Sequence, residues 1–83
     1  LISFLKEKEF GKLRKWVVNN LDNDPSRIYR KIYDILYTNV APNTVPNLVL
    51  IIADYQYKSA FVADHEINML ACLTEIMSQV EFK

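Results

Sequence analysis

Few side chains in this sequence have the chemistry of a metal ligand or a nucleophile. His65, the only histidine, stands between Asp64 and Glu66. Three consecutive residues point in different directions around a helix, whereas a metal site needs its ligands on one side. Cys72, the only cysteine, follows about two helical turns later, with no histidine beside it. We therefore expect Asp64 to cap a helix and Cys72 to be a small buried side chain, with no metal site and no catalytic residue.

Residues suited to nucleotide chemistry are also sparse. Ser26 and Ser59 have no accompanying base, and Gly11 is the only glycine, so no glycine-rich loop could surround a phosphate. We expect this chain to contain no cofactor and neither to bind nor to hydrolyse ATP.

A regular row of tyrosines suggests a binding surface instead. Tyr29, Tyr33 and Tyr37 recur every fourth residue, which aligns side chains along one side of a helix. With the neighbouring aliphatic residues they cover an arc of about 200°, wider than the stripe of somewhat more than about 100° that faces one core. Tyr29 is therefore predicted to be a core residue. Tyr33 and Tyr37 are either half-exposed with their hydroxyls in water or part of a second packing surface.

A basic group is the other candidate for binding. Its members are Lys12, Arg14, Lys15, Arg27, Arg30 and Lys31. They could contact nucleic-acid phosphates, and pairs of helices with a short break between them recur in proteins that read DNA. A solvated helix face is the alternative, which the net charge of zero and the acidic second half of the chain favour.

Charge is distributed unevenly along the sequence. Residues 1–40 carry eight basic and five acidic side chains, a net +3, and residues 41–83 carry two basic and five acidic ones, a net −3. Opposite charges on the two halves would let copies attract one another head to tail. We predict a candidate subunit interface in which a basic surface faces an acidic neighbour. It comprises Arg30, Lys31, Tyr33 and Tyr37.

Helical spacing of apolar residues predicts the elements that position these side chains. A first helix is expected over residues 7–20, because apolar residues recur there at spacings of three and four. These are Phe10, Leu13, Trp16, Val17 and Leu21. Asp24 before Pro25 predicts the start of a second helix, which runs to about Val40, because the carboxylate caps free N–H groups and proline tolerates the first turn.

Two further helices are predicted in the second half. Thr44 is expected to cap the third, which continues through residues 48–63 and is apolar almost all round, as in a central, buried helix. A buried strand at residues 48–52 is the rival interpretation, but no second strand is available to pair with it. The fourth helix runs from Asp64 to about Val80 and keeps apolar residues at helical spacing. These are Ile67, Leu70, Leu73, Met77 and Val80.

Composition agrees with an all-α, compact bundle of about four helices in a single domain over residues 1–83. The chain has 51% hydrophobic residues but only one glycine and three prolines, too few for the many turns of an all-β fold. A single cysteine and the lack of an apolar run of roughly 18 residues indicate a soluble, cytoplasmic protein. Because the sequence opens at Leu1 within an apolar and charged segment, we expect it to be a C-terminal piece of a longer protein.

Three packing motifs occur in the last three predicted helices. They are Asp34, Ile35 and Leu36 in the second predicted helix, Ile52, Ala53 and Asp54 in the third, and Leu70 and Leu73 in the last. This pattern resembles the C-terminal collar domain of sliding-clamp loader ATPase subunits. That family includes the replication factor C small subunits and the bacterial gamma-type subunits. Within it, the residue pattern most resembles that of the small loader subunits of T-even-type bacteriophages.

The resemblance implies a role in assembly. In that family, collar domains pack into a five-membered ring that holds the ATPase modules together while they open a clamp and place it on primer-template DNA. The implied partners are the other clamp loader subunits, with the sliding clamp and DNA reached through the full complex. ATP and Mg²⁺ would bind elsewhere in the parent AAA+ ATPase, in the host cytoplasm if it is viral. The family's Ser-Arg-Cys arginine finger is not carried here, because Ser26 and Arg27 precede Ile28.

Two other functions remain open at this stage. One is a stand-alone DNA-binding module that uses the basic face of the first two helices. The other is a regulatory bundle that binds an amphipathic partner helix.

Overall fold

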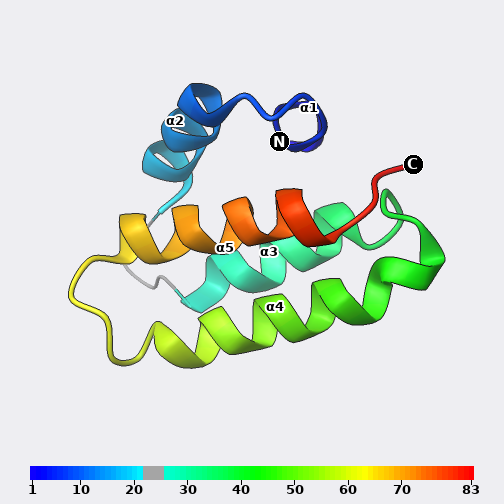
Figure 1. The fold of residues 1–83 in the computed structure, drawn as a ribbon. Coiled ribbons are helices and arrows are strands. Elements are labelled where there is room, and N and C mark those ends of the chain that lie inside the picture. Colours follow the sequence, from blue (N-terminus) through cyan, green and yellow to red (C-terminus); the bar gives the residue numbers. More distant parts are fainter. Residues whose placement is uncertain (22–25) are drawn as a thin grey trace.

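Five α-helices and one 3-10 helix form the described part of the chain, residues 1–21 and 26–83 of a computed structural model (Figure 1). They are α1 (Ile2–Lys6), α2 (Phe10–Asn20), α3 (Ser26–Leu36), η1 (Pro42–Thr44), α4 (Val45–Lys58) and α5 (His65–Gln79). The predicted all-α class is confirmed, and four of the helices are longer than two turns. The helix start predicted at Asp24 and Pro25 lies outside the described residues.

The helices are arranged around α5. Figure 1 shows α3, α4 and α5 lying side by side, with α1 and α2 on the far side of α5 from α4. Helix α4 packs against both α3 and α5, while α1 and α2 pack against each other and against α5. The resulting body measures 32 × 24 × 18 Å.

The single first helix predicted over residues 7–20 is instead two helices joined by a tight turn. Lys8 adopts a left-handed conformation with φ of 56°, which ends α1. The Lys8 N–H bonds to the Leu5 carbonyl at 3.3 Å and the Glu9 N–H bonds to the Phe4 carbonyl at 2.9 Å. This pair of bonds is the Schellman arrangement that satisfies the free carbonyls of a helix end. The prediction failed because a lysine occupies the position at which glycine usually signals such an end.

The sequence predicted N-cap residues for α4 and α5, and only the cap of α5 is confirmed. Asp64 caps α5 as expected, since its Oδ1 accepts a hydrogen bond from the Ile67 N–H at 3.1 Å. Thr44 stands at the N-cap position of α4, but its side chain makes no capping bond. Its hydroxyl donates instead to the Ala41 carbonyl at 2.8 Å. The Ala41 N–H in turn donates to the Glu81 carbonyl at 2.7 Å, so the chain end is held against this turn.

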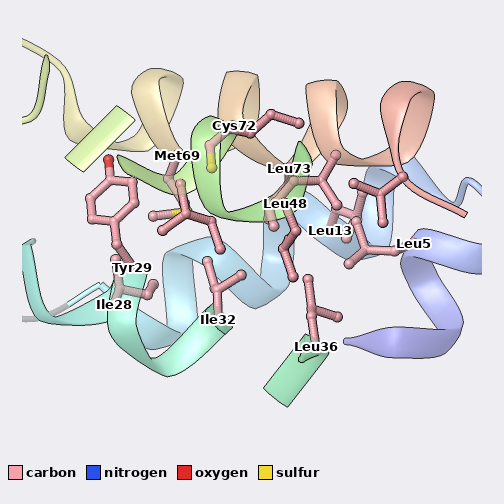
Figure 2. Packing of buried hydrophobic residues seen from close by; sticks show 14 of the residues in the cluster. Leu5, Leu13, Ile28, Tyr29, Ile32, Leu36, Leu48, Met69, Cys72 and Leu73 are labelled. Carbon is pink, nitrogen blue, oxygen red and sulfur yellow. The ribbon is translucent and has the colours of Figure 1, made fainter. Parts of the chain in front are cut away.

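Side chains from all five α-helices meet in one hydrophobic core (Figure 2). Sequence analysis predicted the helix of residues 48–63 to be the most buried, which is wrong. Helix α4 buries only Leu48, Ile51 and Ile52, whereas α5 is the helix enclosed by its neighbours. The residues that α5 buries are Asn68, Met69, Cys72, Leu73 and Ile76.

Two apolar residues predicted on core-facing spacings lie outside the core. Phe10 at the start of α2 is 50% exposed, and Ile67 in the first turn of α5 is 64% exposed. Tyr29 is buried as predicted, and so is Cys72. The strand considered at residues 48–52 is helical, and the extended pairing within the described residues is one isolated bridge between Val40 and Phe82. None of the helices described is both long and apolar enough to cross a membrane.

Candidate subunit interface

The structure brings three of the four predicted interface residues together, Arg30 and Tyr33 on α3 and Tyr37 directly after its last residue. The rings of Tyr33 and Tyr37 have centroids 5.5 Å apart, and the Arg30 guanidinium lies over the Tyr33 ring at 5.3 Å. Arg30 also forms an ion pair with Asp34 at 3.1 Å, one turn further along. Tyr33 is half-buried and Tyr37 is 49% exposed, so these rings combine an apolar body with a solvent-exposed edge.

Lys31, the fourth predicted interface residue, contacts α2 instead of the tyrosine rings. Its ammonium donates a hydrogen bond to Asn20 Oδ1 at 2.9 Å, which joins α3 to the end of α2. With Arg27 and Arg30 it lines a shallow hollow of about 550 Å³. The hollow is mainly cationic, and Asp34 is its one acidic lining residue.

A second set of apolar side chains on α4, missed by sequence reasoning, continues the α3 cluster. A hollow of about 340 Å³ between the two helices is lined by Arg30 and Tyr33 on one side and by Val49 and Ala53 on the other. Further along α4, Tyr57 is 69% exposed and its ring lies 5.2 Å from that of Phe61. We define the α3–α4 face by Arg30, Tyr33, Tyr37, Val49, Ala53 and Tyr57.

A sequence signal for this extension was present. Val49, Ala53, Tyr57 and Phe61 recur every fourth residue, the same spacing that identified the tyrosines of α3. The signal was overlooked because an almost wholly apolar helix was assumed to be central. A helix can also be apolar on two sides because it faces the core on one and a partner on the other.

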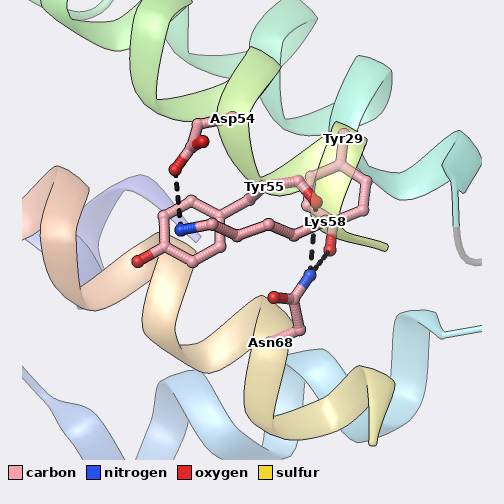
Figure 3. Close-up of polar contacts among 5 residues, drawn as sticks. All are labelled: Tyr29, Asp54, Tyr55, Lys58 and Asn68. Atoms are coloured by element: carbon pink, nitrogen blue, oxygen red, sulfur yellow. Dashed lines mark hydrogen bonds and ion pairs between the residues drawn. The ribbon is translucent and has the colours of Figure 1, made fainter. Parts of the chain in front are cut away.

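A buried polar contact behind this face fixes α3 relative to α4 and α5 (Figure 3). Asn68 of α5 donates from Nδ2 to the Tyr29 hydroxyl oxygen at 2.6 Å and to the Tyr55 carbonyl at 3.3 Å. Burial raises the pKa of the Tyr29 phenol, while the hydrogen bond from Asn68 acts in the opposite direction. Three helices therefore share one amide group, which favours a single arrangement among them.

An apolar groove lies over α5, between α2 and α4. We define the α5 groove by Phe10, Tyr55, Ile67, Leu70, Thr74 and Glu75, which surround a hollow of about 620 Å³. Burial, reinforced by a hydrogen bond to the Glu75 carboxylate, raises the pKa of Tyr55 to about 12. At the edge of the groove, Lys58 lies 4.8 Å from the centre of the Tyr55 ring and pairs with Asp54 at 2.9 Å (Figure 3).

The residues first considered for chemistry are spread apart in the fold. Cys72 lies in the core, where burial raises the pKa of its thiol to about 12. The Glu66 carboxylate pairs with Arg14 of α2 at 3.4 Å. The Nδ1 atom of His65 is buried and has no hydrogen-bond partner among the residues described. Over the same residues, no group of three or more potential metal ligands was found.

Comparison with known proteins adds no assignment. No protein-family model matches the sequence, and no curated protein is significantly similar to it. What the described surface offers is exposed aromatic and aliphatic area on two sides of α4, flanked by charges. Such surfaces are suited to association with another protein.

Proposed function

We propose that this chain is an oligomerisation domain, the collar of a DNA sliding-clamp loader subunit. In this role it holds the loader ring together while the ATPase modules load the clamp onto primer-template DNA. The proposal combines the resemblance, which covers nearly the whole chain, with the surface just described. The domain itself carries out no reaction and acts by packing against other loader subunits.

The observation that carries the proposal is the α3–α4 face. Large apolar side chains on a helix surface are normally covered, yet Tyr57 is 69% and Val49 is 41% exposed on α4. Tyrosine is enriched in protein interfaces because its ring is apolar and its hydroxyl tolerates a wet edge. The paired rings of Tyr33 and Tyr37 fit that description.

Self-association provides the test. The molecular mass of the chain in sedimentation should rise with concentration, and light scattering should show it joining the remaining subunits of a loader. Replacing both Tyr33 and Tyr37 with Ser should abolish assembly at temperatures where thermal melts still show a folded protein. Val18→Ser, at a position on α2 that is 51% exposed and outside the α3–α4 face, serves as the control. A chain that is monomeric at every concentration and joins no loader subunit would overturn the proposal.

The cationic hollow on α3 favours one second candidate, a DNA-binding module. Arg27, Arg30 and Lys31 lie within one arc of the helix, where they could contact adjacent phosphates. Binding of this kind weakens steeply as salt is added, because phosphate contacts release counterions. A titration of duplex and single-stranded DNA over a range of salt concentrations separates the candidates. If the chain is an oligomerisation domain only, it should not bind DNA near physiological salt concentration.

A further inference from the structure

The two apolar surfaces of this domain are separate. Val49 of the α3–α4 face and Tyr55 of the α5 groove are six residues apart on α4, so their side chains point about 120° away from each other. A single flat partner could not cover both surfaces at once. Each surface therefore requires its own contact.

The surfaces differ in shape and in side-chain character. The α3–α4 face carries projecting aromatic rings, with Tyr37 49% and Tyr57 69% exposed. The α5 groove is a hollow of about 620 Å³, bordered by the exposed side chains of Phe10 and Ile67. Projecting rings on one surface and an apolar hollow on the other are complementary, as the packed centre of an interface requires.

The helices that dominate the two surfaces also carry opposite charge. Helix α3 has three basic side chains and one acidic one, and because Arg30 pairs with Asp34, its uncompensated charges are Arg27 and Lys31, which line the hollow that adjoins the α3–α4 face at Arg30. Helix α5 has two acidic side chains and no lysine or arginine. Glu66 of α5 is neutralised by Arg14, but Glu75 makes no ion pair within the described ranges. Its carboxylate accepts a hydrogen bond from the Tyr55 hydroxyl and lies near Lys58, which is itself paired with Asp54. Glu75 thus leaves a negative charge inside the α5 groove.

We infer that the α3–α4 face of one copy of this chain docks into the α5 groove of a second copy. This inference rests on the proposed function, because it identifies which two surfaces meet in the assembly. Pairing of two α3–α4 faces would bring the two cationic hollows that adjoin them near each other and leave both grooves uncovered. Contact between unlike surfaces is heterologous and leaves each copy with one surface for a further neighbour.

Two complementary substitutions test this arrangement. Val49→Glu places a carboxylate in the α3–α4 face, opposite the negative groove, and Ile67→Lys places an ammonium in the groove, opposite the basic face. Both positions are exposed, at 41% and 64%, so both variants should remain folded. Each variant alone should lose self-association, because one of its two surfaces is blocked. An equimolar mixture should form a 1:1 dimer and no larger species, since each variant retains the surface that the other needs.

Sedimentation of the two variants, their mixture and a Val18→Glu control distinguishes the outcomes, with thermal melts as a check on folding. The control should associate like the unmodified chain. Normal self-association of Ile67→Lys would overturn the inference and leave the proposed function standing, because the groove would then not be part of the contact. A mixture that remains monomeric would also overturn the inference. An unmodified chain that never associates would overturn the proposed function itself.

Discussion

At the scale of single residues, the contact between Tyr29 and Asn68 is the polar interaction on which the core depends. Asn68→Leu keeps a similar volume but removes the donor to the buried Tyr29 hydroxyl, whereas the Tyr55 carbonyl still accepts from the Ser59 N–H at 2.9 Å. We expect a loss of about 1–3 kcal/mol in the free energy of unfolding, measured in urea. When Tyr29→Phe is introduced into the Asn68→Leu variant, it should lower the free energy of unfolding by less than it does in the unmodified chain, because the Tyr29 hydroxyl has already lost its Asn68 partner. If the free-energy losses of the two substitutions are strictly additive, the hydrogen bond between Asn68 and Tyr29 contributes nothing to stability.

The buried thiol of Cys72 predicts how stability responds to alkaline pH. Burial raises its pKa from 9.0 to about 12. Between these values the unfolded chain loses the thiol proton and the folded chain keeps it, so the free energy of unfolding falls as pH rises above 9.0. Cys72→Ala should reduce this slope in urea unfolding carried out at a series of pH values, and the remaining slope includes contributions from Tyr29, Tyr55 and Lys58, whose pKa values are also raised. If the free energy of unfolding falls with pH equally steeply in the unmodified chain and in Cys72→Ala, the buried thiol is not a source of the alkaline loss of stability.

At the scale of the helix, α4 has one side in the core and another in solvent. Leu48 is fully buried and Leu50 is 69% exposed, although they are two residues apart. Leu48→Ala should lower the free energy of unfolding by about 2–5 kcal/mol. The same substitution at Leu50 should change it by no more than about 0.5 kcal/mol. Equal losses in denaturant unfolding would show that α4 is enclosed on both sides within one chain.

The turn that divides α1 from α2 gives a further prediction for an element. Lys8 holds a left-handed conformation that costs a residue with a Cβ atom about 1–2 kcal/mol. Lys8→Gly should therefore raise the thermal midpoint, whereas Lys6→Gly, inside α1, should lower it. If glycine lowers the midpoint at both positions, the turn does not control where α1 ends.

Elements were predictable from the sequence where local chemistry determines them. The Asp64 cap and the burial of Tyr29 follow from short-range rules and are confirmed. The break at Lys8 was missed because no glycine marks it. The exposed side of α4 depends on tertiary packing, because a periodicity of apolar residues does not distinguish a core contact from a surface contact. The same limit applied to the candidate interface. The α3 residues were identified, but their partners on α4 emerged only when Val49 and Ala53 were found beside Tyr33.

At the scale of the whole molecule, the fold preserves the charge asymmetry of the sequence. The basic side chains of α3 lie at one surface, and Glu75 of α5 lies at another. Attraction between such surfaces acts over about 8–10 Å at physiological ionic strength and chiefly accelerates association. Association of the chain should therefore slow as salt is added, whereas its apolar contacts are less affected.

Charge reversal on α3 tests whether the location of the charge matters or only its total. Arg30→Glu with Lys31→Glu should slow association and weaken or invert its dependence on salt, because an acidic surface would then face the Glu75 groove. Lys6→Glu with Lys15→Glu changes the net charge equally but at exposed positions on α1 and α2. Association rates measured over a range of salt concentrations should distinguish the two pairs. If both pairs behave alike, net charge alone governs association and the basic surface of α3 has no particular partner. If only the α3 pair loses the salt response, the charges act at a defined contact, and the aromatic rings beside them lie in the same interface.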